Sequence, residues 1–231
     1  ATAIPFGLNT RQYNAWWHQL GGDKIFNEFA NKAAGIDAIL CGNTGAQMGG
    51  WFRKEINTLE DLKGLKFRVA GFAGEVLSRM GVVPQQLAGG DVYPALEKGT
   101  IDATEWVGPY DDEKLGFAKV AKFYYYPGWW EGSAAFHGII NQKAHAALPP
   151  EYRAVLAAAC EECYSYVTSR YDAFNAQAIK RLVGSGTQLK AFSRPIMDAC
   201  YKVTQEVYAE TTAKNASFKR LHDHYFGVQR D

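Results

Sequence analysis

The chain has 231 residues, of which 47% are hydrophobic and 21% are charged, and these values are typical of a globular protein and exclude general disorder. Its 25 basic and 24 acidic side chains nearly cancel, so its charge gives no basis for binding nucleic acid or a membrane surface. No apolar run reaches the length of a membrane span, and the opening ATAIPFGLNT lacks the features of a signal peptide. We expect that any export signal has been removed or lies outside this sequence.

Strand-like and helix-like segments alternate over the first half of the chain. The pattern predicts helices over residues 23–32, 73–80 and 92–98, and strands over 36–42, 66–71, 82–87 and from Ile101. A capping box from Thr58 to Asp61 predicts another helix start, and Gly99 is a typical helix stop. Because single helices separate these strands, the pattern predicts parallel βαβ units and an α/β fold.

The later part of the chain is mostly helical in pattern. Its predicted segments are a strand over 134–141, a long helix from Pro150 to Leu182, a break at 184–186, a strand over 188–192, and a helix that starts at Ser193 with Pro195 in its first turn. No linker separates two consecutive domains. The pattern therefore favours two lobes that are interleaved along the chain.

Four cysteines do not identify a redox or metal site. Cys41 and Cys200 are isolated, whereas Cys160 and Cys163 form a C-x-x-C inside the long predicted helix. A thioredoxin-type or zinc site requires a turn or strand at such a motif, so we expect these two cysteines to pack on one helix face.

Glycine-rich and charged residues mark the candidate chemistry. The loop GNTGAQMGGW (42–51) lets backbone approach a ligand closely, but it has neither dinucleotide nor P-loop spacing. Arg68 lies inside the apolar strand KFRVAG, where its charge requires either a structural ion pair or a ligand carboxylate. Both explanations remain open from the residues alone.

Two glutamates lie in aromatic surroundings. Glu105 and Trp106 follow a predicted strand, at the position where open α/β sheets bind ligands, and Glu131 lies in PGWWEG. The two carboxylates fit an acid and base pair, metal ligands, or partners of Arg68.

Three long runs carry a resemblance to a known family. They are GNTGAQMGGWFRKEI, the run from DLKGLKFRVAG to DEKLGF, and YYYPGWWEG, within a match that extends from Ile4 to about Asn141. The chain resembles the TRAP transporter solute-binding proteins, and within them the 2-oxo-acid and lactate receptors. The resemblance implies a periplasmic receptor with two α/β lobes, which passes a small 2-oxo or 2-hydroxy monocarboxylate to a TRAP permease in the membrane.

The resemblance also implies a binding site. The residue matching Arg68 clamps the substrate carboxylate. A cation that the substrate also touches is surrounded by the residues matching Gln47, Glu105, Trp106 and Glu131. Trp106 contributes its backbone carbonyl. Arg68 and two glutamates sum to a charge of −1 and a monocarboxylate brings it to −2, which a dry site does not hold without a cation or a proton. Oxygen ligands favour Na⁺ or Ca²⁺.

Two further residues are candidates for contact with the substrate. Asn43 lies in the glycine-rich loop, and His137 lies on the strand after PGWWEG. For His137, a place in the core or on the surface is an equal alternative.

The match also suggests how the chain is divided. Residues 1–41 are expected to be part of lobe I, 42–104 to form lobe II, 105–145 to cross over and return along the cleft, and 146–231 to pack helices on both lobes. Relatives carry a further α/β segment before PFGLNTRQYNAWW, which we expect to be missing here. The C-terminal helices, ending in KRLHDHYFGVQRD, suggest a homodimer.

Two alternatives belong to other functional classes. Glu105 and Glu131 fit the acid and base of a carboxylate-metabolising lyase or hydrolase, although no nucleophile or cofactor pattern accompanies them. The ligand-sensing half of a signalling receptor would have the same cleft.

Overall fold

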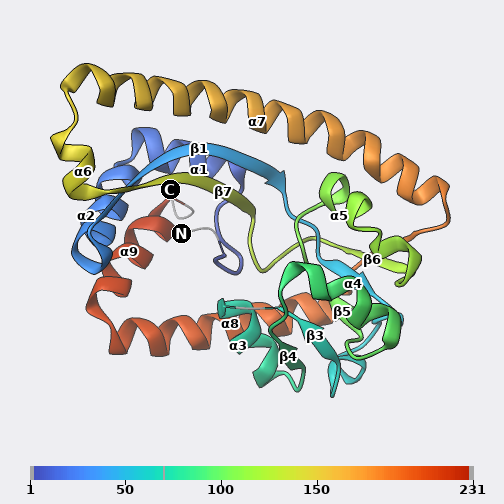
Figure 1. The fold of residues 1–231 in the computed structure, drawn as a ribbon. Helices are drawn as coiled ribbons and strands as arrows, with labels where there is room; N and C mark the ends of the chain where they lie inside the picture. The colour runs from blue at the N-terminus through green and yellow to red at the C-terminus, as the bar shows by residue number, and fades with distance from the viewer. Residues whose placement is uncertain (1–2, 70, 229–231) are drawn as a thin grey trace.

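The computed structural model describes residues 3–69 and 71–228 (Figure 1). The α-helices are α1 (Thr10–Gln19), α2 (Gly22–Ala34), α3 (Gly71–Arg79), α4 (Gly89–Lys98), α5 (Pro109–Leu115), α6 (Gln142–Ala147), α7 (Pro150–Gly184), α8 (Arg194–Lys214) and α9 (Ala216–Gly227). The strands are β1 (Ile36–Ala46), β2 (Gly50–Phe52), β3 (Lys66–Arg68), β4 (Val83–Gln85), β5 (Ala103–Thr104), β6 (Phe123–Tyr126), β7 (Ser133–Asn141) and β8 (Gln188–Ala191).

Six short strands form one sheet in the order β4-β3-β5-β2-β6-β8. The predicted parallel βαβ units are confirmed for β3, β4 and β5, which α3 and α4 connect. No strand was predicted at β2, which runs antiparallel to both β5 and β6. The predicted strand over 36–42 lies in β1, which belongs to another sheet and pairs antiparallel, so it is not part of a parallel unit. This sheet, with its helices, is called lobe II below.

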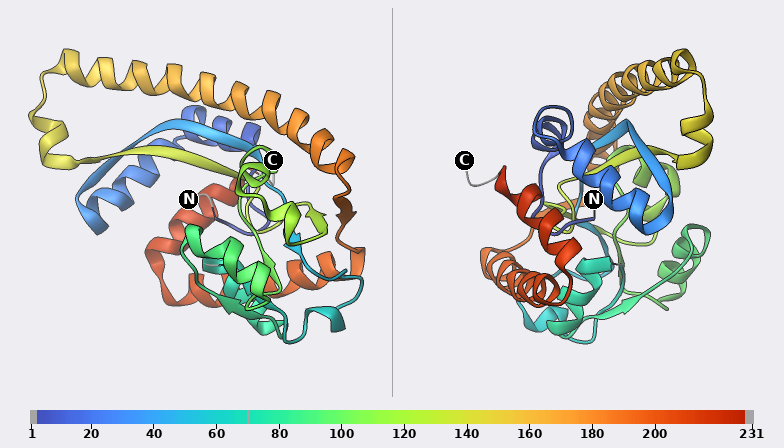
Figure 2. Two further views of the ribbon diagram at one scale, coloured as in Figure 1. Left: turned by 45° about the vertical axis from the view of Figure 1, so that its right-hand side comes forward. Right: turned by 90° about the vertical axis from the view of Figure 1, so that its left-hand side faces the viewer.

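A second, two-stranded sheet pairs β1 with β7 antiparallel, from Ile36 opposite Asn141 to Ala46 opposite Ser133. Aromatic side chains of α1, including Tyr13, Trp16 and Trp17, are buried against it, and α9 adds Tyr225 to the same cluster. This sheet with α1, α2, α6 and α9 is called lobe I. The long helix α7 runs along β1 and continues towards lobe II (Figures 1 and 2).

The chain passes from lobe I to lobe II after β1 and returns after β6, so the lobes are interleaved as predicted. The α/β fold with two lobes and a long helical C-terminal part is confirmed. The proposed boundaries at residues 41, 104 and 145 stay predictions. Ala70, at the end of the predicted strand KFRVAG, and residues 229–231 of KRLHDHYFGVQRD lie outside the described residues.

Two predicted helix starts differ in detail. The carboxylate of Asp61 accepts from the backbone N–H of Thr58, as a capping box requires, but only a 3₁₀ turn at Glu60–Leu62 follows. Ser193 occupies the position before α8, yet its hydroxyl donates to the Asn57 carbonyl instead of capping the helix. Gly99 ends α4 in a left-handed conformation, as predicted.

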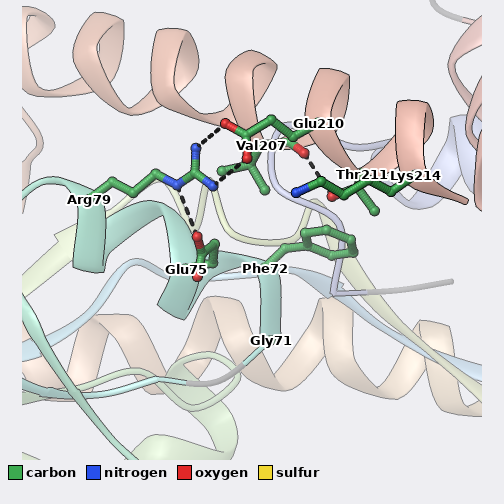
Figure 3. Close-up of a pocket in the computed structure, with 8 residues that line it drawn as sticks. All are labelled: Gly71, Phe72, Glu75, Arg79, Val207, Glu210, Thr211 and Lys214. Atoms are coloured by element: carbon green, nitrogen blue, oxygen red, sulfur yellow. Dashed lines mark hydrogen bonds and ion pairs between the residues drawn. The ribbon is translucent and has the colours of Figure 1, made fainter.

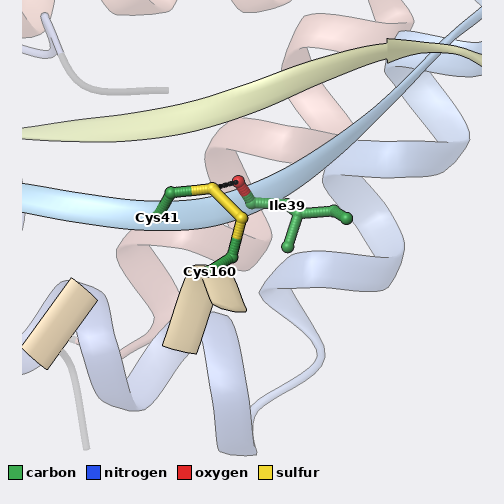
Figure 4. Close-up of a disulfide and its surroundings, with 3 residues drawn as sticks. All are labelled: Ile39, Cys41 and Cys160. Carbon is green, nitrogen blue, oxygen red and sulfur yellow. Dashed lines mark hydrogen bonds between the residues drawn. A yellow bond between two sulfur atoms is a disulfide. The ribbon is translucent and has the colours of Figure 1, made fainter. Parts of the chain in front are cut away.

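The packing interpretation of Cys160 is wrong, because Cys160 forms a disulfide with Cys41 (Figure 4). The two residues are 119 positions apart in sequence and meet because α7 lies along β1. Cys163 is a free and exposed thiol, so it does not pack either, whereas Cys200 is free and buried.

Much of α7 is exposed. Only Ala178 and Leu182 are buried along its length, while Val155 is 65% and Tyr166 63% exposed. Most of the apolar residues that recur at helical spacing therefore do not enter the core of the described chain. Within residues 3–69 and 71–228, no helix combines the length and apolar character that crossing a membrane requires.

Candidate ligand and cation site

Four of the predicted site residues meet where strands of the two sheets end. Arg68 is the last residue of β3, and it pairs with Thr104 at the end of β5, so Glu105 and Trp106 follow directly beside it. Gln47 follows the last residue of β1. The carboxyl ends of the parallel strands β3 and β5 thus bring Arg68, Glu105 and Trp106 together, and Gln47 reaches them from the end of β1.

Arg68 forms an ion pair with Glu105. Its Nη1 lies 2.6 Å from Glu105 Oε1 and 3.3 Å from the Glu105 carbonyl oxygen, and the guanidinium lies 5.1 Å from the centre of the Trp106 ring. Nη2 and Nε of Arg68 have no hydrogen-bond partner among the described residues. The structural ion pair is therefore present, and it leaves one edge of the guanidinium for a second anion.

The Gln47 amide lies between Glu105 and Trp106. Its Nε2 donates to the Trp106 carbonyl oxygen at 2.7 Å and reaches Glu105 Oε2 at 3.5 Å. Gln47 is 5% exposed, and its Oε1 is buried with no partner in the described part of the chain. An unpartnered buried oxygen beside a carboxylate and a carbonyl is a donor set that fits Na⁺ or Ca²⁺.

A close backbone contact joins Gln47 to the segment that carries Glu131. The Gly128 N–H donates to the Gln47 carbonyl at 3.0 Å. A Cβ at position 128 would lie 2.7 Å from Gln47 Cγ, so only glycine permits this approach. This glycine explains part of the PGWWEG motif that the sequence pointed to.

Burial changes the protonation of both glutamates. It raises the pKa of Glu105 to about 8, with Arg68 opposing the rise and the charges of Glu131 and Asp112 adding to it. Burial also raises the pKa of Glu131 to about 7. No hydrogen bond or ion pair to the Glu131 carboxylate is formed within the described residues. The two carboxyls are close enough to interact electrostatically, and the positive charge of Arg68 offsets only part of the cost of burying Glu105.

The amide of Asn43 is used within the fold. Its Oδ1 accepts from Thr10 Oγ1 and from the Gly45 N–H, and its Nδ2 donates to Ser133 Oγ. These bonds tie the end of β1 to α1 and β7. Its role in binding a substrate stays a prediction.

His137 lies in lobe I, between aromatic rings. Its ring centre is 4.7 Å from that of Trp17 and 5.6 Å from that of Phe26, and its Nε2 is 3.2 Å from the Tyr13 hydroxyl. Burial lowers its pKa to about 4. These contacts are those of a core residue, and its contact with a substrate stays a prediction.

Sequence reasoning missed Asp112, which is fully buried close behind the site. It lies in the stretch DATEWVGPYDD that the sequence pointed to, but an acidic residue in the first turn of a helix is usually a surface feature. Nothing in the sequence distinguishes it from the neighbouring Asp111.

A groove of about 470 Å³ between α3 and α8 contains none of the predicted residues (Figure 3). Its charged groups pair with one another: Arg79 binds both oxygens of Glu210 and one oxygen of Glu75. The groove is therefore no extension of the site at Arg68.

Two interleaved α/β lobes with buried ligand-type side chains at their strand ends define a solute-binding receptor. The chain belongs to the family described as bacterial extracellular solute-binding protein, family 7 (DctP), whose pattern matches residues 1–215. Family members are binding proteins, so the alternative of a lyase or hydrolase is not supported.

Three relatives are closely similar. A monocarboxylate 2-oxoacid-binding periplasmic protein of Nostoc sp. is 46% identical over 97% of this chain, which spans 62% of that protein. A TRAP solute-binding protein of Bordetella bronchiseptica, a dimer with copurified calcium and picolinate, is 50% identical with a TM-score of 0.95; the match covers all of this chain and 68% of that one. A TRAP protein of Pseudoalteromonas atlantica with sodium and pyruvate is 38% identical with a TM-score of 0.93, and the match covers 99% and 70% of the two chains.

Proposed function

We propose that this chain is the receptor of a TRAP transporter for a small 2-oxo or 2-hydroxy monocarboxylate, bound together with Na⁺ or Ca²⁺. The observation that carries the proposal is the cluster of Arg68, Glu105, Gln47 and the Trp106 carbonyl at the strand ends. Relatives at 38–50% identity that hold pyruvate with sodium, or picolinate with calcium, support it.

The cation would be held by Gln47 Oε1, Glu105, Glu131 and the Trp106 carbonyl. The unpartnered Gln47 oxygen and the raised pKa values of both glutamates support this assignment, because burial disfavours the charge of both carboxylates even with Arg68 beside Glu105. When bound, the ion supplies positive charge that the oxygens of the acid can share. Rotation of the Gln47 amide by half a turn would present Oε1 where Nε2 now donates.

The acid would be held by the free edge of Arg68. Because Nη1 is already fixed by Glu105, the planar guanidinium is oriented before the ligand arrives, and Nη2 and Nε are left to bind a carboxylate in bidentate fashion. A cation–π contact with the Trp106 ring further stabilises the position of the guanidinium.

We also propose delivery to a TRAP permease in the membrane and a periplasmic location. The extracellular character of the family supports both. The disulfide between Cys41 and Cys160 supports the location independently, because disulfides persist in oxidising compartments. A ligand-sensing role in signalling would use the same site and differs in its partner, which copurification with the permease identifies.

A homodimer is a further proposal. In this chain α9 packs on α1 and α2 of its own lobe I and keeps an exposed face with Lys219 and Asp223. The exposed Val155 and Tyr166 of α7 support association through the helical region. Light scattering at tens of micromolar is expected to give twice the chain mass, and a monomer mass contradicts the proposal.

Titration of the metal-stripped protein with pyruvate tests the proposed function. We expect binding without product formation, and an affinity that rises when sodium or calcium is added. Native mass spectrometry of the purified chain is expected to show a retained acid and ion. Turnover of a 2-oxo acid, or no binding of the acid under any of these conditions, contradicts the proposal.

A further inference from the structure

Asp112 lies fully buried behind the proposed cation site and is not among its ligands. Its Oδ2 accepts from Trp51 Nε1 at 3.0 Å and from the Tyr124 hydroxyl at 2.7 Å, and its Oδ1 accepts from the Val107 N–H at 3.2 Å. Trp51 and Tyr124 face each other across β2 and β6, with ring centres 4.0 Å apart. Three donors therefore hold one carboxylate rigidly on the sheet of lobe II.

The bond to Val107 acts on the peptide group that carries a proposed ligand oxygen. Val107 N and Trp106 O belong to the same peptide unit, which is trans. In a planar trans peptide the N–H and the C=O point in opposite directions. Asp112 holds this unit at its N–H end, and Gln47 Nε2 contacts its oxygen at the other end at 2.7 Å. The direction of the Trp106 carbonyl is therefore set by Asp112.

The charge of Asp112 also acts on the site. A peptide N–H that donates to a carboxylate is polarised, and its carbonyl oxygen becomes more negative. This polarisation favours a cation at the Trp106 carbonyl.

The geometry points to Asp112 as a positioning residue for the cation: its carboxylate orients and polarises the Trp106–Val107 peptide so that the Trp106 carbonyl faces the ion. The inference rests on the proposed cation site and deepens it. Groups behind a metal ligand commonly orient it and tune its basicity, and their loss weakens metal binding about 10–100-fold.

A purely structural role is the competing explanation. Met48 N–H donates to the Val107 carbonyl at 3.0 Å, so the loop has a second anchor, and Asp112 also joins α5 to β2 and β6. A structural residue lowers the unfolding temperature of the protein when it is replaced, but leaves the ion affinity of the folded fraction unchanged. A positioning residue lowers that affinity.

The test compares calcium binding by calorimetry in three variants of the full chain. In Asp112→Asn the amide has two possible orientations. If its oxygen accepts from Trp51 and Tyr124, its NH₂ group faces the Val107 N–H and the bond to Val107 is lost. If its oxygen accepts from Val107, the bond remains but the negative charge is lost. We expect about 10–100-fold weaker calcium binding. Asp111→Asn removes the same charge from the next residue, whose carboxylate binds the Tyr171 hydroxyl, and is expected to bind calcium like the parent.

The third variant, Tyr124→Phe, removes one bond to Oδ2 and leaves the bond to Val107. It is expected to unfold at a lower temperature and to lose much less calcium affinity than Asp112→Asn, because the bond from Val107 to Asp112 remains. An Asp112→Asn protein that is folded and binds calcium like the parent overturns the inference but leaves the proposed function standing. A parent protein that binds neither calcium nor sodium overturns the proposed function, and the inference with it.

A measurement on the unaltered chain covers the case in which Asp112→Asn does not fold. Calcium titration followed by NMR is expected to shift the Trp106 carbonyl carbon and the Val107 amide together, with the dissociation constant found by calorimetry. A Val107 amide that stays unmoved while calcium binds would show that its bond to Asp112 is not linked to the ion, and would overturn the inference.

Discussion

Arg68 and Glu105 are joined across the ends of two neighbouring parallel strands, with Nη1 2.6 Å from Oε1. The side chain of Arg68 is 20% exposed and that of Glu105 13%, so the pair is largely removed from water but still reachable by a ligand. A partly desolvated pair of this kind costs much when one partner is removed, because the other charge is left alone. Replacing either Arg68 or Glu105 is therefore expected to affect the stability of the protein as well as ligand binding.

Replacement of Arg68 by methionine is expected to remove binding of the acid. Loss of a desolvated bidentate contact costs on the order of 2–5 kcal/mol, and Glu105 also loses its partner. Arg68→Lys is expected to bind poorly, since an ammonium cannot replace the planar fork. Calorimetry with pyruvate measures both. Arg79→Met, at an exposed arginine that pairs with Glu210, is the control and should bind as the parent does. Near-parental affinity in Arg68→Met would exclude Arg68 from the site.

Acid and cation are expected to bind cooperatively. If Glu105 and Glu131 hold an ion that the acid also touches, the ion raises the affinity for the acid by the same factor by which the acid raises the affinity for the ion. Glu131→Gln should reduce this factor and change the free energy of unfolding little. The reason is that the Glu131 carboxylate has no hydrogen-bond or ion-pair partner to lose among residues 3–69 and 71–228. The exposed Glu97→Gln is the matched control. An acid affinity that is indifferent to both ions, and equal in Glu131→Gln, contradicts the shared site.

Without a cation, the stability of the protein is expected to fall as the pH rises from about 6.5 to 9. Burial raises the pKa of Glu105 to about 8 and of Glu131 to about 7, so the folded chain binds more protons than the unfolded chain in this window. The free energy of unfolding therefore decreases with pH. His137, whose pKa is lowered to about 4, has the opposite effect, but only below its unfolded value of 6.5.

Thermal unfolding in a chelator measures this dependence. Added calcium should abolish the fall, since it favours the charged carboxylates, and Glu105→Gln should flatten it without calcium. A midpoint that rises over the same pH range in the chelator would show that neither glutamate is protonated in the folded protein at neutral pH.

Loss of the disulfide is expected to destabilise the fold by about 2–5 kcal/mol. Cys41→Ser and the reduced parent should unfold at the same, lower urea concentration, because the bridge between β1 and α7 is absent in both. Cys163→Ser should unfold like the parent, since Cys163 is exposed and free. A thiol reagent should modify one cysteine in the folded chain and Cys200 only after unfolding. Equal stability of Cys41→Ser and the parent contradicts the bridge.

Local signals predicted the elements well and their long-range partners poorly. Gly99 and the apolar spacing from Pro150 place helix ends within a few residues of those observed, because caps and periodicity act over short stretches. The disulfide between Cys41 and Cys160 was missed because it depends on how α7 crosses β1, which no local pattern contains. The antiparallel pairing of β1 with β7 was missed for the same reason.

Part of the candidate site was predictable, because ligands commonly bind at the carboxyl ends of parallel strands. Arg68, Glu105 and Trp106 follow from the sequence because β3 and β5 are neighbours in a parallel arrangement. The resemblance added Gln47, which reaches them from β1. Asp112 could not be separated from Asp111, because its burial depends on the stacked rings of Trp51 and Tyr124, which lie on two other elements of the fold.

The antiparallel pair β1–β7 places the proposed ligands at a mechanically sensitive point. Gln47 follows its last residue on one strand, and Glu131 precedes Ser133, the first residue of the other, which pairs with Ala46. Gln47 lies between β1 and β2, and Glu131 lies between β6 and β7, so both stand in segments that join this ribbon to the sheet of lobe II. A rotation of one lobe against the other that bends these segments would change the separation of Gln47 from Glu131, and an ion held by both residues would oppose that change.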